Sequence, residues 1–162
     1  MSVDRREGAE DPQIRAVRLR PLLAIAVSVE EPVVVDVERR YVSFTGGTFE
    51  GRGGLRGIVL PGGTDWQRVR PDGSLELDAH YALRSDDGDG IEVHSTGVRR
   101  AGAEVLRRLN AGDRVDPEEY YFRTHIRLRT SARALAYLDG LVGISSGRRD
   151  AALVHIDVHE VL

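Results

Sequence analysis

The segment from Gly46 to Gly88 constrains the fold more than any other part of the chain. Short alternating stretches are separated there by turns of glycine, proline and aspartate, at 61–63, 71–73 and 86–88. Between Ser74 and Arg84 apolar residues occupy every second position, as expected of a strand whose successive side chains point to opposite faces. Each glycine would cost a helix about 1 kcal/mol. The segment therefore predicts short antiparallel strands joined by tight turns.

The rest of the chain continues this pattern. Alternating or β-branched runs predict strands at 14–29, 33–45, 64–70, 74–84, 91–98, 120–129, 141–145 and 153–162, with Gly46-Gly47 expected to end the second. Apolar residues at four-residue spacing predict one short helix over 99–110, and 132–138 predicts a helical turn. Many short strands indicate an antiparallel barrel or sandwich, and the glycine-rich bends favour a closed barrel. We expect a disordered tail over 1–13 and one all-β barrel domain over 14–162.

Composition excludes several kinds of chemistry. The chain has no cysteine, which removes disulfides, thiolate metal sites and cysteine nucleophiles. It also has no lysine, which removes Schiff-base chemistry and a Walker-type phosphate loop. A net charge of −3 disfavours nucleic-acid binding. Without a signal sequence or an apolar run of the ~20 residues that span a bilayer, we expect a cytoplasmic protein with no membrane partner.

Six motifs in a fixed order resemble a known family. They are G-G-T-F-E-G at 46–51, P-G-G-T-D-W at 61–66, R-P-D-G at 70–73, L-D-A-H-Y at 77–81, D-D-G at 86–88 and Y-Y-F-R-T at 120–124. Over Leu19 to Leu162 this set is similar to domain of unknown function 3237, also called UPF0311. The resemblance implies a β-barrel like those of allene oxide cyclase, dirigent proteins and lipocalins, often assembled into homo-oligomers. It implies no settled activity, and the family usually has Arg at the position of His80.

Asp65 and Trp66 form the first candidate for chemistry. They directly follow the turn at 61–63. An apolar neighbour raises the pKa of a carboxyl group, so Asp65 beside an indole could transfer protons at a barrel mouth. In the alternative interpretation Asp65 caps the turn and Trp66 fills the core.

The second candidate comes from two alternating strands, and its geometry has two solutions. If the apolar faces line the barrel, the interior holds Tyr81, Tyr120 and Phe122, which is core with one or two phenols. If the polar faces line it, the interior is a protic cavity with His80, Tyr121, Arg123 and His125. Neighbouring residues of a strand face opposite sides, so both sets cannot line the interior. An apolar interior is usual for a small barrel, whereas the family motifs include residues of the polar face.

His155, Asp157 and His159 alternate on one strand and suggest a metal site. Same-face residues on a strand lie about 7 Å apart, so three in a row rarely reach one ion. We predict neither a metal nor a cofactor.

These observations favour a cofactor-free cyclase or isomerase acting by acid–base catalysis on a small, largely apolar molecule bound in the barrel. We expect catalytic roles for Asp65, His80, Tyr121 and Arg123, and ligand contacts from Phe49, Trp66, Tyr81 and His125. Two alternatives remain: a non-catalytic barrel that binds a small molecule, and an oligomerisation module with a filled interior.

Overall fold

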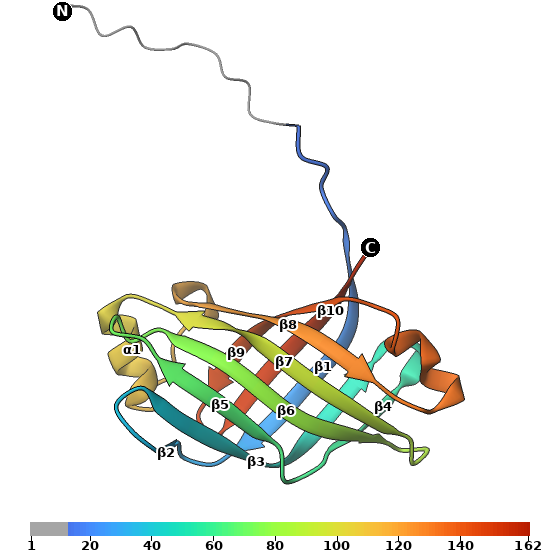
Figure 1. Cartoon of the computed structure of the whole chain (residues 1–162), viewed down its shortest axis with the longest axis horizontal. Coiled ribbons are helices and arrows are strands. Elements are labelled where there is room, and N and C mark those ends of the chain that lie inside the picture. Colours follow the sequence, from blue (N-terminus) through green and yellow to red (C-terminus); the bar gives the residue numbers. More distant parts are fainter. Residues whose placement is uncertain (1–12) are drawn as a thin grey trace, which may run out of the picture.

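The strands of this protein form one antiparallel sheet that closes on itself (Figure 1). The computed structural model describes residues 13–162, so the predicted tail over 1–13 lies outside the described residues except for Gln13. The strands are β1 (Leu19–Val29), β2 (Val33–Val34), β3 (Arg39–Gly51), β4 (Arg56–Val59), β5 (Thr64–Val69), β6 (Leu75–Ser85), β7 (Gly90–Arg100), β8 (Tyr121–Arg129), β9 (Gly143–Asp150) and β10 (Leu153–Val161). The helices are α1 (Ala103–Asn110) and the short 3-10 turns η1 (Arg52–Gly54), η2 (Pro117–Glu119) and η3 (Arg133–Leu138).

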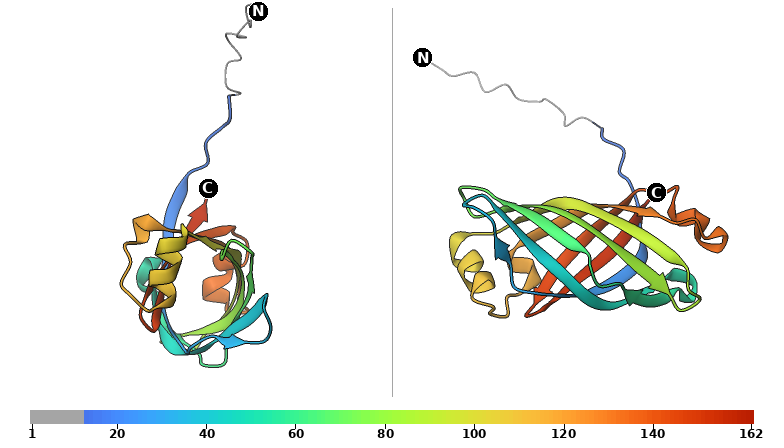
Figure 2. Two further views of the ribbon diagram at one scale, coloured as in Figure 1. Left: turned by 90° about the vertical axis from the view of Figure 1, so that its left-hand side faces the viewer. Right: turned by 60° about the horizontal axis from the view of Figure 1, so that its bottom comes forward.

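Closure depends on β1, which pairs with β10 on one side and with β3 on the other. Strands β4 and β5 both lie between β3 and β6, so they act as one strand interrupted at residues 60–63. With this pair counted once and the short β2 set aside, the barrel has eight strands, seen end-on in Figure 2. The predicted antiparallel barrel with one short helix is confirmed.

Several predicted strand boundaries were wrong: the strand predicted over 141–145 runs over Gly143–Asp150, the one predicted over 33–45 is divided into β2 and β3, and β7 continues to Arg100. Strand β1 begins at Leu19 rather than at Ile14, and β3 continues through Gly46 and Gly47 to Gly51. Gly47 has φ +139°, and a Cβ atom there would lie 2.0 Å from the carbonyl oxygen of Ala26 on β1. The glycine therefore does not end the strand; it lets the backbones of β1 and β3 approach where the barrel closes.

Helix α1 is confirmed with a later start than predicted. Arg99 and Arg100 belong to β7, where their backbones pair with Phe122 and Tyr121 of β8. The predicted helical turn over 132–138 is present as η3. Among residues 13–162 no helix is both long enough and apolar enough to cross a bilayer.

The interior of the barrel differs between its two ends. Helix α1 lies at one end and η3 at the other (Figures 1 and 2). Toward the η3 end the interior is filled by apolar side chains that are almost fully buried: Ile25, Phe49, Val59, Leu83, Ile91, Val93, Ile126, Leu128, Leu138 and Val158. Polar side chains enter the interior in the α1 half. The η3 half is therefore filled by apolar packing, and the α1 half is where a site can form.

The close packing of β7 on β8 yields a stability prediction. A Cβ atom at Gly97 would lie 2.1 Å from the carbonyl oxygen of Arg123, whereas one at Gly90 of the same strand would have no atom within 4 Å. We expect Gly97→Ala to lower the free energy of unfolding by at least about 2 kcal/mol, because the strands must separate. Gly90→Ala is the matched control and should stay within about 0.5 kcal/mol of wild type. Urea unfolding of both variants measures this, and equal midpoints would contradict it.

Candidate functional site

A cavity of about 60 Å³ occupies the α1 half of the barrel. A single water needs roughly 15 Å³ of such space, so the enclosed part holds several waters, and because the cavity is not closed on all sides a ligand need not lie wholly within it. Apolar side chains form much of its wall, and they are Val27, Val29, Val42, Phe44, Leu77, Ala79, Phe122, Val154 and Ile156. The polar part of the wall consists of Asp65, Gln67, Tyr81, Ser95, Arg99, Thr124 and Arg149.

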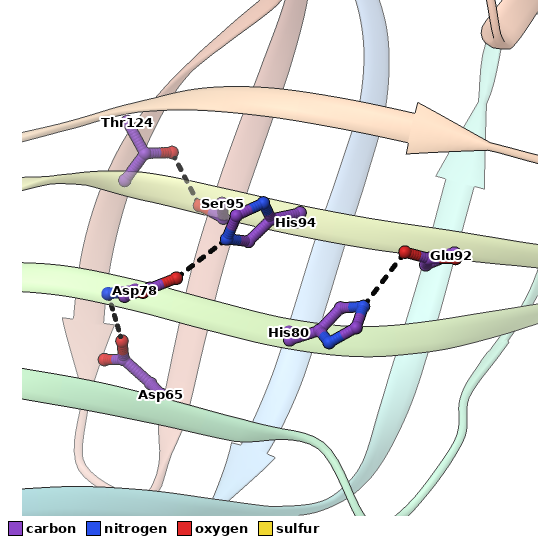
Figure 3. Close-up of polar contacts among 7 residues, drawn as sticks. All are labelled: Asp65, Asp78, His80, Glu92, His94, Ser95 and Thr124. Atoms are coloured by element: carbon purple, nitrogen blue, oxygen red, sulfur yellow. Dashed lines mark hydrogen bonds and ion pairs between the residues drawn. The ribbon is translucent and has the colours of Figure 1, made fainter.

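Asp65 is the one carboxylate that residues 13–162 contribute to this wall. It pairs with Ala79 of β6 and Val42 of β3, both inward-facing, so the barrel alternation directs its side chain inward. One carboxylate oxygen accepts a hydrogen bond from Gln67 Nε2 at 2.6 Å. The other accepts one from the backbone N–H of Asp78 at 3.2 Å, and Figure 3 shows this second bond. Burial raises the pKa of Asp65 to about 6, because loss of solvation outweighs these hydrogen bonds and the attraction of Arg99.

Three arginines surround the same end of the cavity. Arg99 and Arg149 line it, and Arg40 donates a hydrogen bond through Nε to Gln67 Oε1 at 2.7 Å. Gln67 thus links Arg40 to Asp65. Burial first, and then repulsion from Arg40 and Arg149, lowers the pKa of Arg99 to about 10. All three guanidinium groups are therefore close enough to influence one another.

Hydroxyl groups complete the polar wall. Tyr81 is buried with its ring 5.1 Å from the ring of Phe44, and burial raises the pKa of its phenol, so it stays protonated and can donate a hydrogen bond. Ser95, Thr124 and Ser145 form a chain of buried hydroxyl groups across β7, β8 and β9, with separations of 2.9 and 2.6 Å. Figure 3 shows the first of these two bonds.

The apolar faces of the strands line the barrel, which decides between the two solutions that the sequence left open. On β6 and β8 the buried residues are the apolar set, and His80, Tyr121, Arg123 and His125 are on the outer surface. Figure 3 shows His80 there, 3.0 Å from Glu92, beside His94, which lies 2.8 Å from Asp78. The interior of an eight-stranded barrel is just wide enough to be filled by the side chains of one strand face. The apolar face takes this place because its burial is favourable. These four residues therefore cannot contact a molecule inside the barrel.

The remaining predicted ligand-contact residues lie in different parts of the barrel. Trp66 is 42% exposed on the outer face, with its ring 5.0 Å from that of Tyr41 and the Arg39 guanidinium 5.6 Å above it. Phe49 points inward but belongs to the filled half and does not line the cavity. Of the eight predicted site residues, the structure brings only Asp65 and Tyr81 to the cavity.

Sequence reasoning missed Gln67, Arg40, Arg99 and Arg149. The signal was available in the alternation, because Arg99 shares the strand face of Ile91, Val93 and Ser95 and is therefore directed inward. Gln67 comes two residues after Asp65 on β5, so the two side chains share the inward face of that strand. A polar or charged residue on an otherwise apolar strand face is therefore the sequence feature that marks this site.

The described part of the chain contains no group of three or more histidine, aspartate or glutamate side chains placed to bind one metal ion. Asp157, which the sequence placed between two histidines, instead accepts a hydrogen bond from Arg148 at 2.8 Å.

Several known proteins share this fold. A crystal structure of a conserved protein of unknown function from Rhodopseudomonas palustris superposes with a TM-score of 0.89 at 35% identity, covering 93% of this chain and all of the other. A β-barrel-like protein from Acinetobacter baumannii gives a TM-score of 0.77 at 32% identity, covering 94% of this chain and all of the other. An enzyme from Penicillium herquei, at 16% identity and a TM-score of 0.69 over 94% of this chain, shares the fold alone.

Sequence comparison identifies the family. A UPF0311 protein of Rhodopseudomonas palustris is 41% identical over 124 residues, which cover 76% of this chain and 80% of the relative. A UPF0311 protein of Clostridium acetobutylicum is 36% identical over 116 residues, covering 68% and 73%. The model of the family described as protein of unknown function DUF3237 matches residues 17–161. The chain therefore belongs to the DUF3237 family, whose members include the UPF0311 proteins.

Proposed function

We propose that this protein is a cofactor-free isomerase or cyclase that acts by acid–base catalysis on a small, largely apolar molecule held in the α1 half of the barrel. The observation that carries the proposal is Asp65, whose half-buried carboxyl group faces an otherwise largely apolar cavity and has a pKa of about 6. A base with a pKa close to the working pH is ionised often enough to accept a proton and releases it readily.

The proposed step is a proton transfer at a carbon next to a carbonyl group. The Asp65 carboxylate takes the proton, and the electron pair of the C–H bond moves into the carbonyl to form an enolate. The protonated phenol of Tyr81 lines the same cavity and donates a hydrogen bond to that oxygen. Where the substrate carries a C=C bond beyond that carbon, the enolate is conjugated with it; Asp65 returns its proton to the far carbon of this C=C bond while the double bond moves next to the carbonyl, which completes an isomerisation without an oxidant or a second reactant.

Tyr81 takes the part that the sequence assigned to Tyr121 and Arg123, since these two lie outside the barrel. The apolar wall formed by residues such as Val27, Phe44 and Phe122 favours an apolar substrate and excludes bulk water from the enolate. The Penicillium herquei protein, described as an enzyme, supports the proposal to the extent that a barrel of this fold can carry an active site.

The raised pKa of Asp65 predicts how stability depends on pH. The folded-state pKa of about 6 lies above the reference value of 3.8, so the folded protein binds the extra proton between these two values. Ionisation of Asp65 therefore lowers the free energy of unfolding as pH rises through this window, and the loss persists above it. We expect Asp65→Asn to be about 1–3 kcal/mol more stable than wild type at pH 7, with little difference near pH 4.

Thermal or urea unfolding at several pH values measures this difference. Asp113→Asn changes an exposed carboxylate of the loop after α1 and is the matched control. A wild-type protein more stable than Asp65→Asn at pH 7 would show that the Asp65 carboxylate is not strained by burial.

Proton abstraction can be tested without knowing the substrate. We expect wild-type protein to catalyse deuterium incorporation from D₂O into some members of a panel of enolisable aryl and alkyl ketones. Asp65→Asn should reduce the rate at least about 100-fold, because a positioned general base contributes 10²–10⁴-fold. The wild-type rate should rise with pH through about 6 as Asp65 ionises. Proton NMR measures the exchange.

His80→Gln is the control for this assay, because His80 lies on the outer face and should leave the rate unchanged. Equal exchange rates in wild type and Asp65→Asn would refute the catalytic role of Asp65. Ketones that shift cavity resonances without exchanging would instead favour the non-catalytic binding barrel.

A further inference from the structure

Three arginines converge on the α1 end of the cavity from strands that are far apart in the sequence. Arg40 comes from β3, Arg99 from β7 and Arg149 from β9. Arg99 is only 5% exposed, and Arg149 and Arg40 are half-buried beside it. Because β3 and β9 are separated by β1 and β10 in the barrel, only the closed sheet brings these three side chains together across the interior.

Arg99 is incompletely satisfied. Its Nε atom is fully buried and has no hydrogen-bond partner, the one such side-chain atom among residues 13–162. A buried donor without a partner is costly, and buried charges are normally paired. Since Arg99 also lines the cavity, its missing partner can be supplied from the cavity.

The part of the chain that the structure describes does not neutralise this cluster with an ion pair. Within the described residues no carboxylate forms an ion pair with Arg40, Arg99 or Arg149. Asp65, the carboxylate of this wall, is bonded to Gln67 and to a backbone N–H instead. With a pKa of about 10, Arg99 remains positively charged at neutral pH. Three positive charges and one negative charge leave the site with a net charge of +2.

We infer that the barrel interior binds a small carboxylate with an apolar chain, whose carboxylate group pairs with Arg99 and Arg149 while its chain lies against the apolar wall. A guanidinium group offers two parallel N–H donors to a carboxylate, which suits this ligand group. The apolar side chains Val27, Phe44 and Phe122 line the same cavity, so an inorganic anion would leave their surface uncovered. This inference rests on the proposed function, because it names the class of molecule that the same site accepts.

Three probe molecules that differ in charge and in apolar chain test the inference. Hexanoate carries the carboxylate and the apolar chain, hexanamide has the same shape without the charge, and sulfate has charge without a chain. We expect hexanoate to bind wild-type protein at least about tenfold more tightly than either, since hydrogen bonds to charged groups are the strong ones. Isothermal titration calorimetry at neutral pH measures the three dissociation constants.

Variants assign the selectivity to the cluster. Arg99→Gln should reduce the preference for hexanoate over hexanamide to less than about threefold, and Arg149→Gln should reduce it in the same direction. Arg127→Gln removes an exposed outer-face arginine and should leave the preference unchanged. Asp65→Asn should tighten hexanoate binding, because it removes the negative charge that competes for the arginines. If Arg99→Gln does not fold by circular dichroism, Arg149→Gln provides the same comparison.

Three results would overturn the inference. One is equal binding of hexanoate and hexanamide to wild-type protein, and another is no hexanoate binding up to about 10 mM, where even a millimolar complex would be detected. Tighter binding of sulfate than of hexanoate would show an anion site without an apolar subsite and would also overturn it. None of these results bears on Asp65 in the ketone exchange assay, so the two proposals can fail separately.

Discussion

Closure of the sheet is the constraint on which the rest of this structure depends. Strand β1 pairs with β10 and β3, so the eight barrel strands close on themselves and one face of each must point into a narrow interior. Period-two alternation then assigns each residue of a strand to the inside or the outside, except at the bulge of β1, where Leu22 and Leu23 are both buried. The apolar face goes inside because its burial drives folding. Any polar residue on that face is carried inside with it, and this is how Asp65, Gln67 and Arg99 reach the interior.

The two halves of the barrel balance stability against chemistry. Toward η3 the interior is packed with side chains such as Phe49, Leu83 and Ile126, which are almost fully buried. Toward α1 it holds a carboxyl group with a raised pKa and an arginine donor without a partner, and both are unfavourable in the folded protein. Proteins retain such groups where function requires them, since active sites are commonly less stable than the structure around them. The proposed acid–base step and the proposed carboxylate site both use these costly groups.

The candidate site could be predicted from the sequence only in part. Asp65 and Tyr81 were identified from their motifs, and both line the cavity. His80, Tyr121, Arg123, His125 and Trp66 were selected because their side chains are chemically versatile, yet all lie on the outer face. Residue type alone could not separate these two groups, because either strand face is locally compatible with the same turns and the same alternation. The arginines of the interior were missed because arginine is so rarely buried without a partner that its residue type gives no reason to place it inside.

The sequence by itself determined the fold and the family of this protein. Strict alternation on 74–84 and 120–129, glycine-rich bends and the ordered motifs were sufficient, because they are local features that each strand and turn must satisfy alone. The tertiary structure decided which face is inside, how β4 and β5 join into one interrupted strand, and which charges meet. Arg40, Arg99 and Arg149 are separated by 59 and 50 residues in the chain, and only the closed barrel makes them neighbours. Their mutual repulsion in a poorly solvated interior is a property of the folded protein that no single strand contains.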